Sequence, residues 1–427
     1  MTLSMIITLA IIALMVIVFI SDKLPFGTPA LLAAALLVIL GQADIATAFS
    51  GFTDKNVIMI MGFMACMAAL QKTKFIYDLQ GALGKVAAKG GIMGFALLII
   101  AIMAIGNVIS GTAYYVLVIS IIATIPYNKN LPNSRILLPA AFASGMAGWL
   151  PNGVVLYTGL VASLVTNAGG SDITVSIGKF CLMNIIWSAI YLVWSIIGHK
   201  LLPNRDIHGT QLEEAAPEKK EFVPTMSALQ QKVVYIGYIL MVVAMMFLDK
   251  LPGESGYALP VVIAGVFLCI GALSFKEMIG NMFSPVMIMM ASVIGVAAAM
   301  GNCGLSAFLG EKVATMLGGS PSLMVLVFTF ALLTSVAATL TGASFGSIFI
   351  FAPIGIALCL QLGYSPIPLA LACVKAGWIN WFLPIDGLPA LAMGTGKYKL
   401  TEFWTYILPL WILMLGFYSV MCVVFFG

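Results

Sequence analysis

The stretch Ala372–Ala390, which reads ACVKAGWINWFLPIDGLPA, decides how the rest of the chain is interpreted. It lies inside an apolar segment that is long enough to cross a lipid bilayer. Yet it contains two ionisable residues, Lys375 and Asp386, together with Pro384 and Pro389, which interrupt helices. Lipid cannot form hydrogen bonds with a broken backbone, so this break must face protein or line a cavity. An ionisable side chain at such a place indicates a functional site.

The composition restricts the class of protein. Of the 427 residues, 62% are hydrophobic and only 8% are charged, which is too few charges to cover the surface of a soluble domain. We therefore expect an all-α polytopic membrane protein. No basic cluster is interleaved with aromatic residues, so nucleic acid is not an expected partner. The seven cysteines form no CxxC motif, and no cofactor or metal is expected beyond a possible Na⁺ as coupling ion.

Apolar runs of about 15–25 residues predict the membrane spans. They fall at 3–20, 29–40, 56–70, 136–165 and 175–197 in the first half, and at 233–248, 258–273, 285–300, 367–392 and 403–426 in the second. Each half also has two apolar helices around a polar tip, at 92–125 with the tip at 106–112 and at 323–360 with the tip at 339–344, which we interpret as a re-entrant hairpin. The segments 136–165 and 367–392 are predicted to be broken helices.

Short matching motifs indicate that the halves are repeats. LGKVA at 83–87 matches LGEKVA at 309–314, ISGTA at 109–113 matches LTGAS at 340–344, and WLP at 149–151 matches FLP at 382–384. The three pairs occur in the same order. We expect a first repeat at 1–200, a cytoplasmic linker at 201–232 and a second repeat at 233–427. The segment around the first motif predicts an amphipathic helix in each repeat. The segment around the third motif predicts a broken helix in each repeat.

The charge distribution favours an inverted arrangement. Five spans in each half is an odd number, so the second repeat would face the opposite way in the membrane. If the basic segment 72–89 is cytoplasmic, fifteen Lys and Arg residues fall on the cytoplasmic side and four on the other. We therefore expect a multi-pass protein of the cell membrane with both termini extracytoplasmic and the lipid bilayer as its surroundings.

Inverted repeats with broken helices are typical of secondary transporters. The start of a half-helix presents N–H groups that suit an anion, and its end presents carbonyl groups that suit Na⁺. The tips and breaks supply the candidate residues. Those expected to bind the substrate are Ser110, Gly111, Thr112, Asn152, Gly153, Thr341, Gly342, Ala343, Gly387 and Pro389. Those expected to couple transport to an ion are Asn107, Ser144, Gly148, Thr339, Lys375 and Asp386.

The order of amphipathic helix, hairpin with a Ser-x-Thr tip (Ser110–Thr112) and Pro-Asn break (Pro151–Asn152) resembles the ion transporter superfamily. Within it, the chain is similar to the divalent anion/sodium symporter family, which carries dicarboxylates, citrate or sulfate. The resemblance implies a secondary active transporter of small anions, not an enzyme. It also implies a homodimer in which a transport domain moves like an elevator against a scaffold domain.

Two residues of the second break leave alternatives open. Lys375 could replace a sodium ion and give cation-independent exchange. Asp386 could bind Na⁺ or carry a proton, or both side chains could be structural. The alternative functions are a cation/proton antiporter and a permease for another anion.

Overall fold

The computed structural model describes residues 1–21, 24–25, 27–75, 77–78, 91–109, 112–123, 131–168, 173–207, 226–316, 321–342, 344–385 and 387–427. Helices dominate the described part. The first half contains α1 (Leu3–Ser21), α2 (Thr28–Ile39), α3 (Ile45–Ala48), η1 (Ser50–Thr53), α4 (Lys55–Gln71), α6 (Gly91–Gly106), α7 (Thr112–Ala123), α8 (Asn133–Ala143), η2 (Pro151–Gly153), α9 (Val155–Asn167), α10 (Ile177–Gly198) and η3 (His199–Leu201).

The second half contains α11 (Ala228–Met246), η4 (Leu248–Lys250), α12 (Ser255–Cys269), α13 (Phe275–Met282), α14 (Pro285–Asn302), α15 (Leu305–Met316), α16 (Leu323–Thr341), α17 (Ser344–Gln361), α18 (Ile367–Gly377), α19 (Gly387–Thr395) and α20 (Leu400–Phe426). Six helical stretches among the described residues are long and apolar enough to cross a membrane. The expected class, an all-α polytopic membrane protein, is confirmed. The helix of 305–316 is present as α15, whereas most of its expected counterpart, at 79–90, lies outside the described residues.

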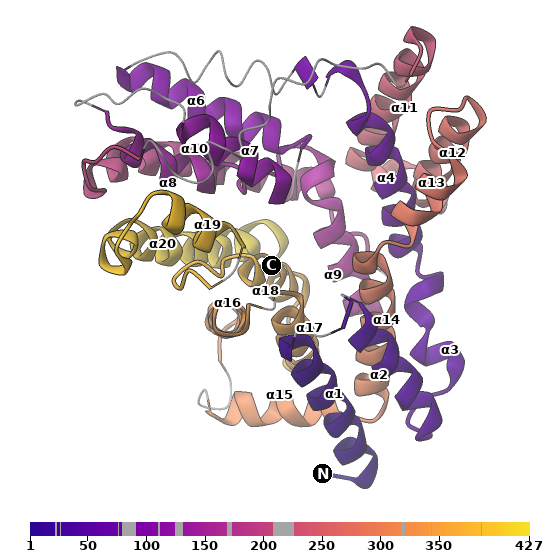
Figure 1. The fold of residues 1–427 in the computed structure, drawn as a ribbon. Helices are drawn as coiled ribbons and strands as arrows, with labels where there is room; N and C mark the ends of the chain where they lie inside the picture. Colours follow the sequence, from indigo (N-terminus) through magenta and orange to yellow (C-terminus); the bar gives the residue numbers. More distant parts are fainter. Residues whose placement is uncertain are drawn as a thin grey trace.

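The helices gather in two parts (Figure 1). On the right of the view, α1 to α4 lie with α11 to α14, and on the left α6, α7, α8 and α10 lie with α16, α18, α19 and α20. The helices α9 and α17 lie between the two parts, and α15 crosses one end. Packing between the halves is reciprocal, since α2 packs on α14 while α4 packs on α12.

Glycine brings backbones together in the part formed by α1–α4 and α11–α14. A Cβ atom on Gly295 of α14 would overlap the carbonyl oxygen of Ala48, and one on Gly51 would overlap that of Ala291. A Cβ atom on Gly62 of α4 would lie 2.5 Å from the backbone nitrogen of Val261 in α12. These contacts leave no room for side chains, so the helices of this part are held at fixed separations.

Ion pairs hold α4 at both of its ends. Lys55 at the start of α4 lies 3.7 Å from Glu254, and Lys72 at its end lies 3.0 Å from Glu277 of α13. Glu277 also completes a capping box with Ser274 at the start of α13. Both pairs therefore link the first half to the second.

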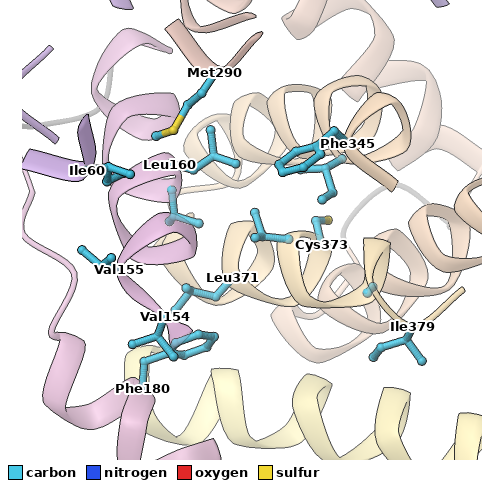
Figure 2. Packing of buried hydrophobic residues seen from close by; sticks show 14 of the residues in the cluster. Ile60, Val154, Val155, Leu160, Phe180, Met290, Phe345, Leu371, Cys373 and Ile379 are labelled. Carbon is cyan, nitrogen blue, oxygen red and sulfur yellow. The ribbon is translucent and has the colours of Figure 1, made fainter. Parts of the chain in front are cut away.

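A continuous apolar core lies between the two parts. Figure 2 shows Leu160 of α9 on the side of the helix toward Phe345 of α17, Ile60 on the opposite side, and Leu371 of α18 next to Val154 at the start of α9. All five side chains are buried. The broken helices are thus surrounded by packed apolar side chains, so their polar groups need hydrogen-bond partners within the protein.

Two features differ from the sequence-based expectation. The second tip was expected at 339–344, but α16 continues through Thr341, and only then does Gly342 leave the helix with φ +67°. Thr339 and Thr341 are helical, and their hydroxyl groups donate to backbone carbonyls of the preceding turn of α16. The short helices α3, η1 and α13 were not predicted because each is shorter than the apolar runs that mark a span.

Candidate functional site

The first break separates α8 from α9 and is held by one asparagine. The buried side chain of Asn107 follows α6, and its Oδ1 accepts hydrogen bonds from the backbone N–H groups of Gly148, Trp149 and Leu150 at 2.9, 2.6 and 3.3 Å. The Nδ2 group of Asn152 donates to the backbone oxygen of Asn107 at 2.5 Å. The first tip and the first break, predicted separately, therefore form one hydrogen-bonded unit.

Two glycines make this unit possible. Gly148 has φ +121°, which L side chains rarely adopt, and a Cβ atom there would lie 2.9 Å from Cγ of Asn184 in α10. A Cβ atom on Gly153 would lie 2.6 Å from the backbone nitrogen of Gly148. Ser144 is buried at the same place, with its hydroxyl group donating to the carbonyl of Ala141 at 2.5 Å. Its backbone oxygen faces the tip, 3.1 Å from the Cβ position of Gly106.

The second break separates α18 from α19. At this break, side chains of neighbouring helices donate hydrogen bonds to the backbone carbonyl groups. The Ser335 hydroxyl group and the Trp411 indole donate to the carbonyl of Ile379 at 2.5 and 3.1 Å. The indole of Trp404 donates to the carbonyl of Phe382 at 2.6 Å. Both tryptophans lie on α20, seven residues apart and therefore on one face of the helix. The helix α20 thus fixes the path of this break.

The second tip contacts the second break as the first tip contacts the first. The Nδ2 group of Asn380 lies 3.4 Å from the hydroxyl oxygen of Ser344, the first residue of α17. A Cβ atom on Gly377 would lie 3.1 Å from the backbone oxygen of Ser344. On the other side of the tip, the hydroxyl groups of Thr339 and Thr341 donate to carbonyls four residues earlier in α16, at 2.8 and 2.7 Å.

Of the other residues predicted to line the site, the structure describes some and not others. Thr112 is the first residue of α7, Gly387 begins α19 with φ +23°, and Pro389 is buried in α19. Four predicted positions lie outside the described residues, namely Ser110, Gly111, Ala343 and Asp386.

The two breaks meet. The rings of Phe142 at the end of α8 and Trp381 in the second break are 5.0 Å apart, edge to face. A Cβ atom on Gly145 would lie 3.8 Å from a methyl carbon of Leu388. Elements distant in the sequence therefore form one region at the middle of the α6–α10 and α16–α20 part.

Lys375 lies in the last turn of α18, next to the second break, and only 7% of it is exposed. Its ammonium nitrogen is 5.7 Å from the ring centre of Tyr157 in α9 and 5.1 Å from that of Tyr418 in α20. Within the described part of the chain, no ion pair or hydrogen bond to this ammonium is present. Aromatic faces thus stabilise the charge without neutralising it.

A hydrogen bond extends this contact to the first break. The hydroxyl group of Tyr418 donates to Oδ1 of Asn184 at 2.5 Å, and Asn184 lies against Gly148. Sequence reasoning missed Tyr157, Asn184 and Tyr418. Asn184 carried a signal, as a carboxamide in the middle of an apolar span, whereas tyrosines are common in such helices and carried none.

Metal-ligating side chains do not gather in the described residues, where no group of three His, Cys, Asp or Glu side chains could hold a metal ion. The cysteines are free thiols, and Cys373 and Cys422 are buried near Lys375. In its described part, the site is therefore composed of backbone groups, hydroxyl groups, carboxamides, aromatic rings and one ammonium.

A model of the citrate transporter (CitMHS) family matches residues 16–262, more than half of the chain. The chain belongs to this family. The resemblance to anion transporters of the ion transporter superfamily is thereby confirmed, and the chain belongs to a family of multi-pass membrane transporters rather than of enzymes.

Two curated relatives are also transporters. "Uncharacterized transporter YfbS" of Escherichia coli (strain K12) is 24% identical over 142 residues, which are 33% of this chain and 23% of the relative. "Uncharacterized transporter sll0640" of Synechocystis sp. (strain ATCC 27184 / PCC 6803 / Kazusa) is 22% identical over 199 residues, 46% of this chain and 32% of the relative. The matched part of the chain thus spans about a quarter and a third of their lengths.

Two solved structures share the fold over nearly the whole chain. The YdaH transporter of Alcanivorax borkumensis has a TM-score of 0.61 and 16% identity, and the match covers 92% of this chain and 88% of that one. MtrF of Neisseria gonorrhoeae, described with a class of antimetabolite efflux pumps, has a TM-score of 0.62 and 14% identity, covering 99% and 95%. At these identities the likeness shows the fold alone.

Proposed function

We propose that this protein is a secondary active transporter of small anions, with di- and tricarboxylates such as citrate as the substrate class. The main observation in support is that the first and second backbone breaks meet beside the buried ammonium of Lys375. A buried ammonium that has no ion-pair partner among the described residues attracts an anion and repels a cation. The family's description as citrate transporters agrees with this chemistry.

The residues proposed to contact the substrate are those of the two tips and the two breaks. The three N–H groups at 148–150 already bond to Asn107, so we propose that substrate contacts at the first break come from Asn152 and Gly153. The others proposed are Ser110, Gly111, Thr112, Thr341, Gly342, Ala343, Gly387 and Pro389. Small and hydroxyl-bearing residues allow a ligand to approach the backbone closely.

The proposed transport cycle is an elevator motion. The glycine contacts of α1–α4 and α11–α14 support a rigid scaffold, and the tips and breaks support a compact substrate-carrying unit. The coupling is to Na⁺ or to exchange of a second anion, with Asn107, Ser144, Gly148, Thr339, Lys375 and Asp386 as the proposed coupling residues. We propose a homodimer, as the family resemblance implies.

Inverted repeats, at 1–200 and 233–427 around the linker 201–232, are part of the same proposal. The similar order of the long helices and the reciprocal packing of α2 on α14 and α4 on α12 support it. The proposed topology has both termini outside the cell membrane. It puts Lys72 and Glu277 on one side and Lys55 and Glu254 on the other, in agreement with their ion pairs.

Cation/proton antiport through Asp386 is the alternative function. The buried ammonium of Lys375 disfavours it, because a bound cation in the same site would meet a like charge. No observation on the described residues favours this alternative over anion transport.

Uptake into proteoliposomes tests the proposal. The purified full chain is reconstituted, and initial uptake of labelled citrate, succinate and sulfate is measured with imposed Na⁺ or pH gradients. We expect saturable uptake of at least one carboxylate, and loss of that uptake in Asn152→Ala. Cation–proton exchange without any anion flux would replace the proposal by the alternative.

A further inference from the structure

A groove lies between α10 and α20, two helices that are each long and apolar enough to cross a membrane. Its volume is about 350 Å³. Three of its lining side chains, Val193, Ile197 and Leu413, are between 40% and 60% exposed. The groove is therefore open to the hydrocarbon chains of the bilayer. All of its lining residues are apolar, namely Ala189, Ile190, Val193, Trp194 and Ile197 of α10 and Leu413 of α20.

The length of the groove matches one leaflet of a bilayer. On α10 it is lined by residues between 189 and 197, a stretch of helix about 12–13 Å long. The membrane span that contains this stretch ends at Leu201. The groove thus begins about one turn inside the end of the span and ends near the middle of a hydrocarbon core that is about 30 Å thick. One acyl chain of a phospholipid fits along it.

Basic side chains gather where the groove reaches the end of the span. Lys200 follows Ile197 by three residues and lies in η3, where side chains three residues apart share a face. Lys200 is exposed and forms no ion pair within the described residues. The segment η3 packs on α8 and α20, which brings further basic residues to this end of the groove. They are Arg135, Arg205, Lys397 and Lys399.

The two acidic side chains of the same region already have partners. Glu402 lies 2.5 Å from Arg205, and Oδ1 of Asp206 accepts a hydrogen bond from Nδ2 of Asn133 at 2.9 Å. Among the described residues, this end of the groove therefore carries an excess of positive charge. Basic pockets between membrane helices at the level of the headgroups attract anionic lipids.

We propose that the groove between α10 and α20 binds an anionic phospholipid, with one acyl chain along 189–197 and the phosphate group on Lys200. A neutral lipid lacks the attraction to the basic end, and a phosphate without chains lacks the apolar contact. The lipid fills the space between two helices that the bond from Tyr418 to Asn184 joins inside the protein. Its binding therefore stabilises the fold around both breaks.

The test measures the Tm of the purified full chain in detergent. The added compounds are dioleoylphosphatidylglycerol, dioleoylphosphatidylcholine and glycerol 3-phosphate. Lys200→Gln removes the charge at the end of the groove, and Ala189→Phe fills the groove. The controls are Lys276→Gln, at an exposed lysine of α13, and Ile185→Phe, at an exposed position of α10 one turn outside the groove.

We expect phosphatidylglycerol to raise the Tm of the wild type by about 2 °C or more, because a ligand that binds the folded state stabilises it. Phosphatidylcholine should raise it much less, and glycerol 3-phosphate should not raise it. Lys200→Gln and Ala189→Phe should lose most of the rise, and both controls should keep it. An equal rise with either of the other compounds, a full rise in either groove variant, or an equal loss in the controls overturns the proposal.

Photolabelling locates the lipid without any variant. Wild-type protein is reconstituted in vesicles of phosphatidylcholine that contain phosphatidylglycerol with a diazirine in its acyl chain, and the label is mapped by mass spectrometry. We expect more label at 189–201 than on the exposed apolar face of α11, where Ile236 is 68% exposed. Equal labelling of the two helices would mean that the groove holds only the surrounding lipid, and it overturns the proposal.

Discussion

The hydroxyl group of Tyr418 donates a 2.5 Å hydrogen bond to Oδ1 of Asn184 and joins α20 to α10 inside the protein. The same tyrosine ring faces Lys375, and the same asparagine lies against Gly148. The bond therefore links the ammonium beside the second break to the backbone of the first. It connects two parts of the site that the sequence separates by more than two hundred residues.

Tyr418→Phe removes this hydrogen bond and keeps the ring over Lys375. Because a buried carboxamide oxygen loses its partner, we expect the protein to lose about 1 kcal/mol of stability. We also expect slower anion exchange. The Tm and the exchange rate check the two effects. Tyr364→Phe, at the half-exposed turn after α17, is the control and should change neither.

Asn107→Ala is expected to disturb the first break more severely. It removes the acceptor of three backbone N–H groups in a loop that is buried at Gly148 and half-buried at Trp149 and Leu150. We expect a loss of about 2–3 kcal/mol, seen as a lower Tm, together with loss of anion uptake. In the control Asn281→Ala only one bond is lost, from Nδ2 to the carbonyl of Glu277 on α13. A Tm for Asn107→Ala equal to that of the control would show that Asn107 does not hold the break.

The glycine contacts of the proposed scaffold give a paired test in two helices. Gly295→Ala in α14 would place a methyl group against the carbonyl of Ala48, and we expect a loss of about 2–3 kcal/mol from overpacking. Gly265→Ala in α12 meets no atom within 4 Å and should be neutral or stabilise the helix by about 0.5–1 kcal/mol. The two Tm values are compared with the wild type. Equal values would contradict the close backbone packing.

The proposed topology predicts the side on which fusion partners are active. Alkaline phosphatase, which folds outside the cytoplasm, should be active when fused after Gly427. A fluorescent protein inserted in the linker at 208–225 should fold in the cytoplasm. If the phosphatase is inactive and the fluorescent protein does not fold, the basic segments lie outside the cytoplasm and the proposed orientation is wrong.

The sequence predicted the membrane-spanning helices but not every detail of the tips and short helices. Apolar runs of about 15–25 residues had to be helices because lipid leaves only helices and closed barrels to satisfy a backbone, and barrel strands are shorter. Thr339 and Thr341 were placed in a tip because they are polar, yet each hydroxyl group bonds a carbonyl within α16 and the helix continues. The short helix α13 had a signal in Ser274 and Glu277, a capping box, which the search for apolar runs did not use.

The sequence predicted which residues form the two breaks, but not which hydrogen bonds and aromatic contacts join them. Proline, glycine and charge in an apolar segment marked both breaks. Which donor meets which acceptor depends on tertiary packing, so the bonds from Asn107 to 148–150 and from Trp411 to Ile379 could not be read from spacing. The partners of Lys375 come from α9 and α20, 218 and 43 residues away in the chain at Tyr157 and Tyr418.

The most direct test of the central claim is a structure determined with the best-transported anion bound. The account predicts density for the anion where the two breaks meet, in contact with the ammonium of Lys375, and no such density in Lys375→Met. Density at another place in the protein, with the region between Asn152 and Lys375 unchanged, would contradict it.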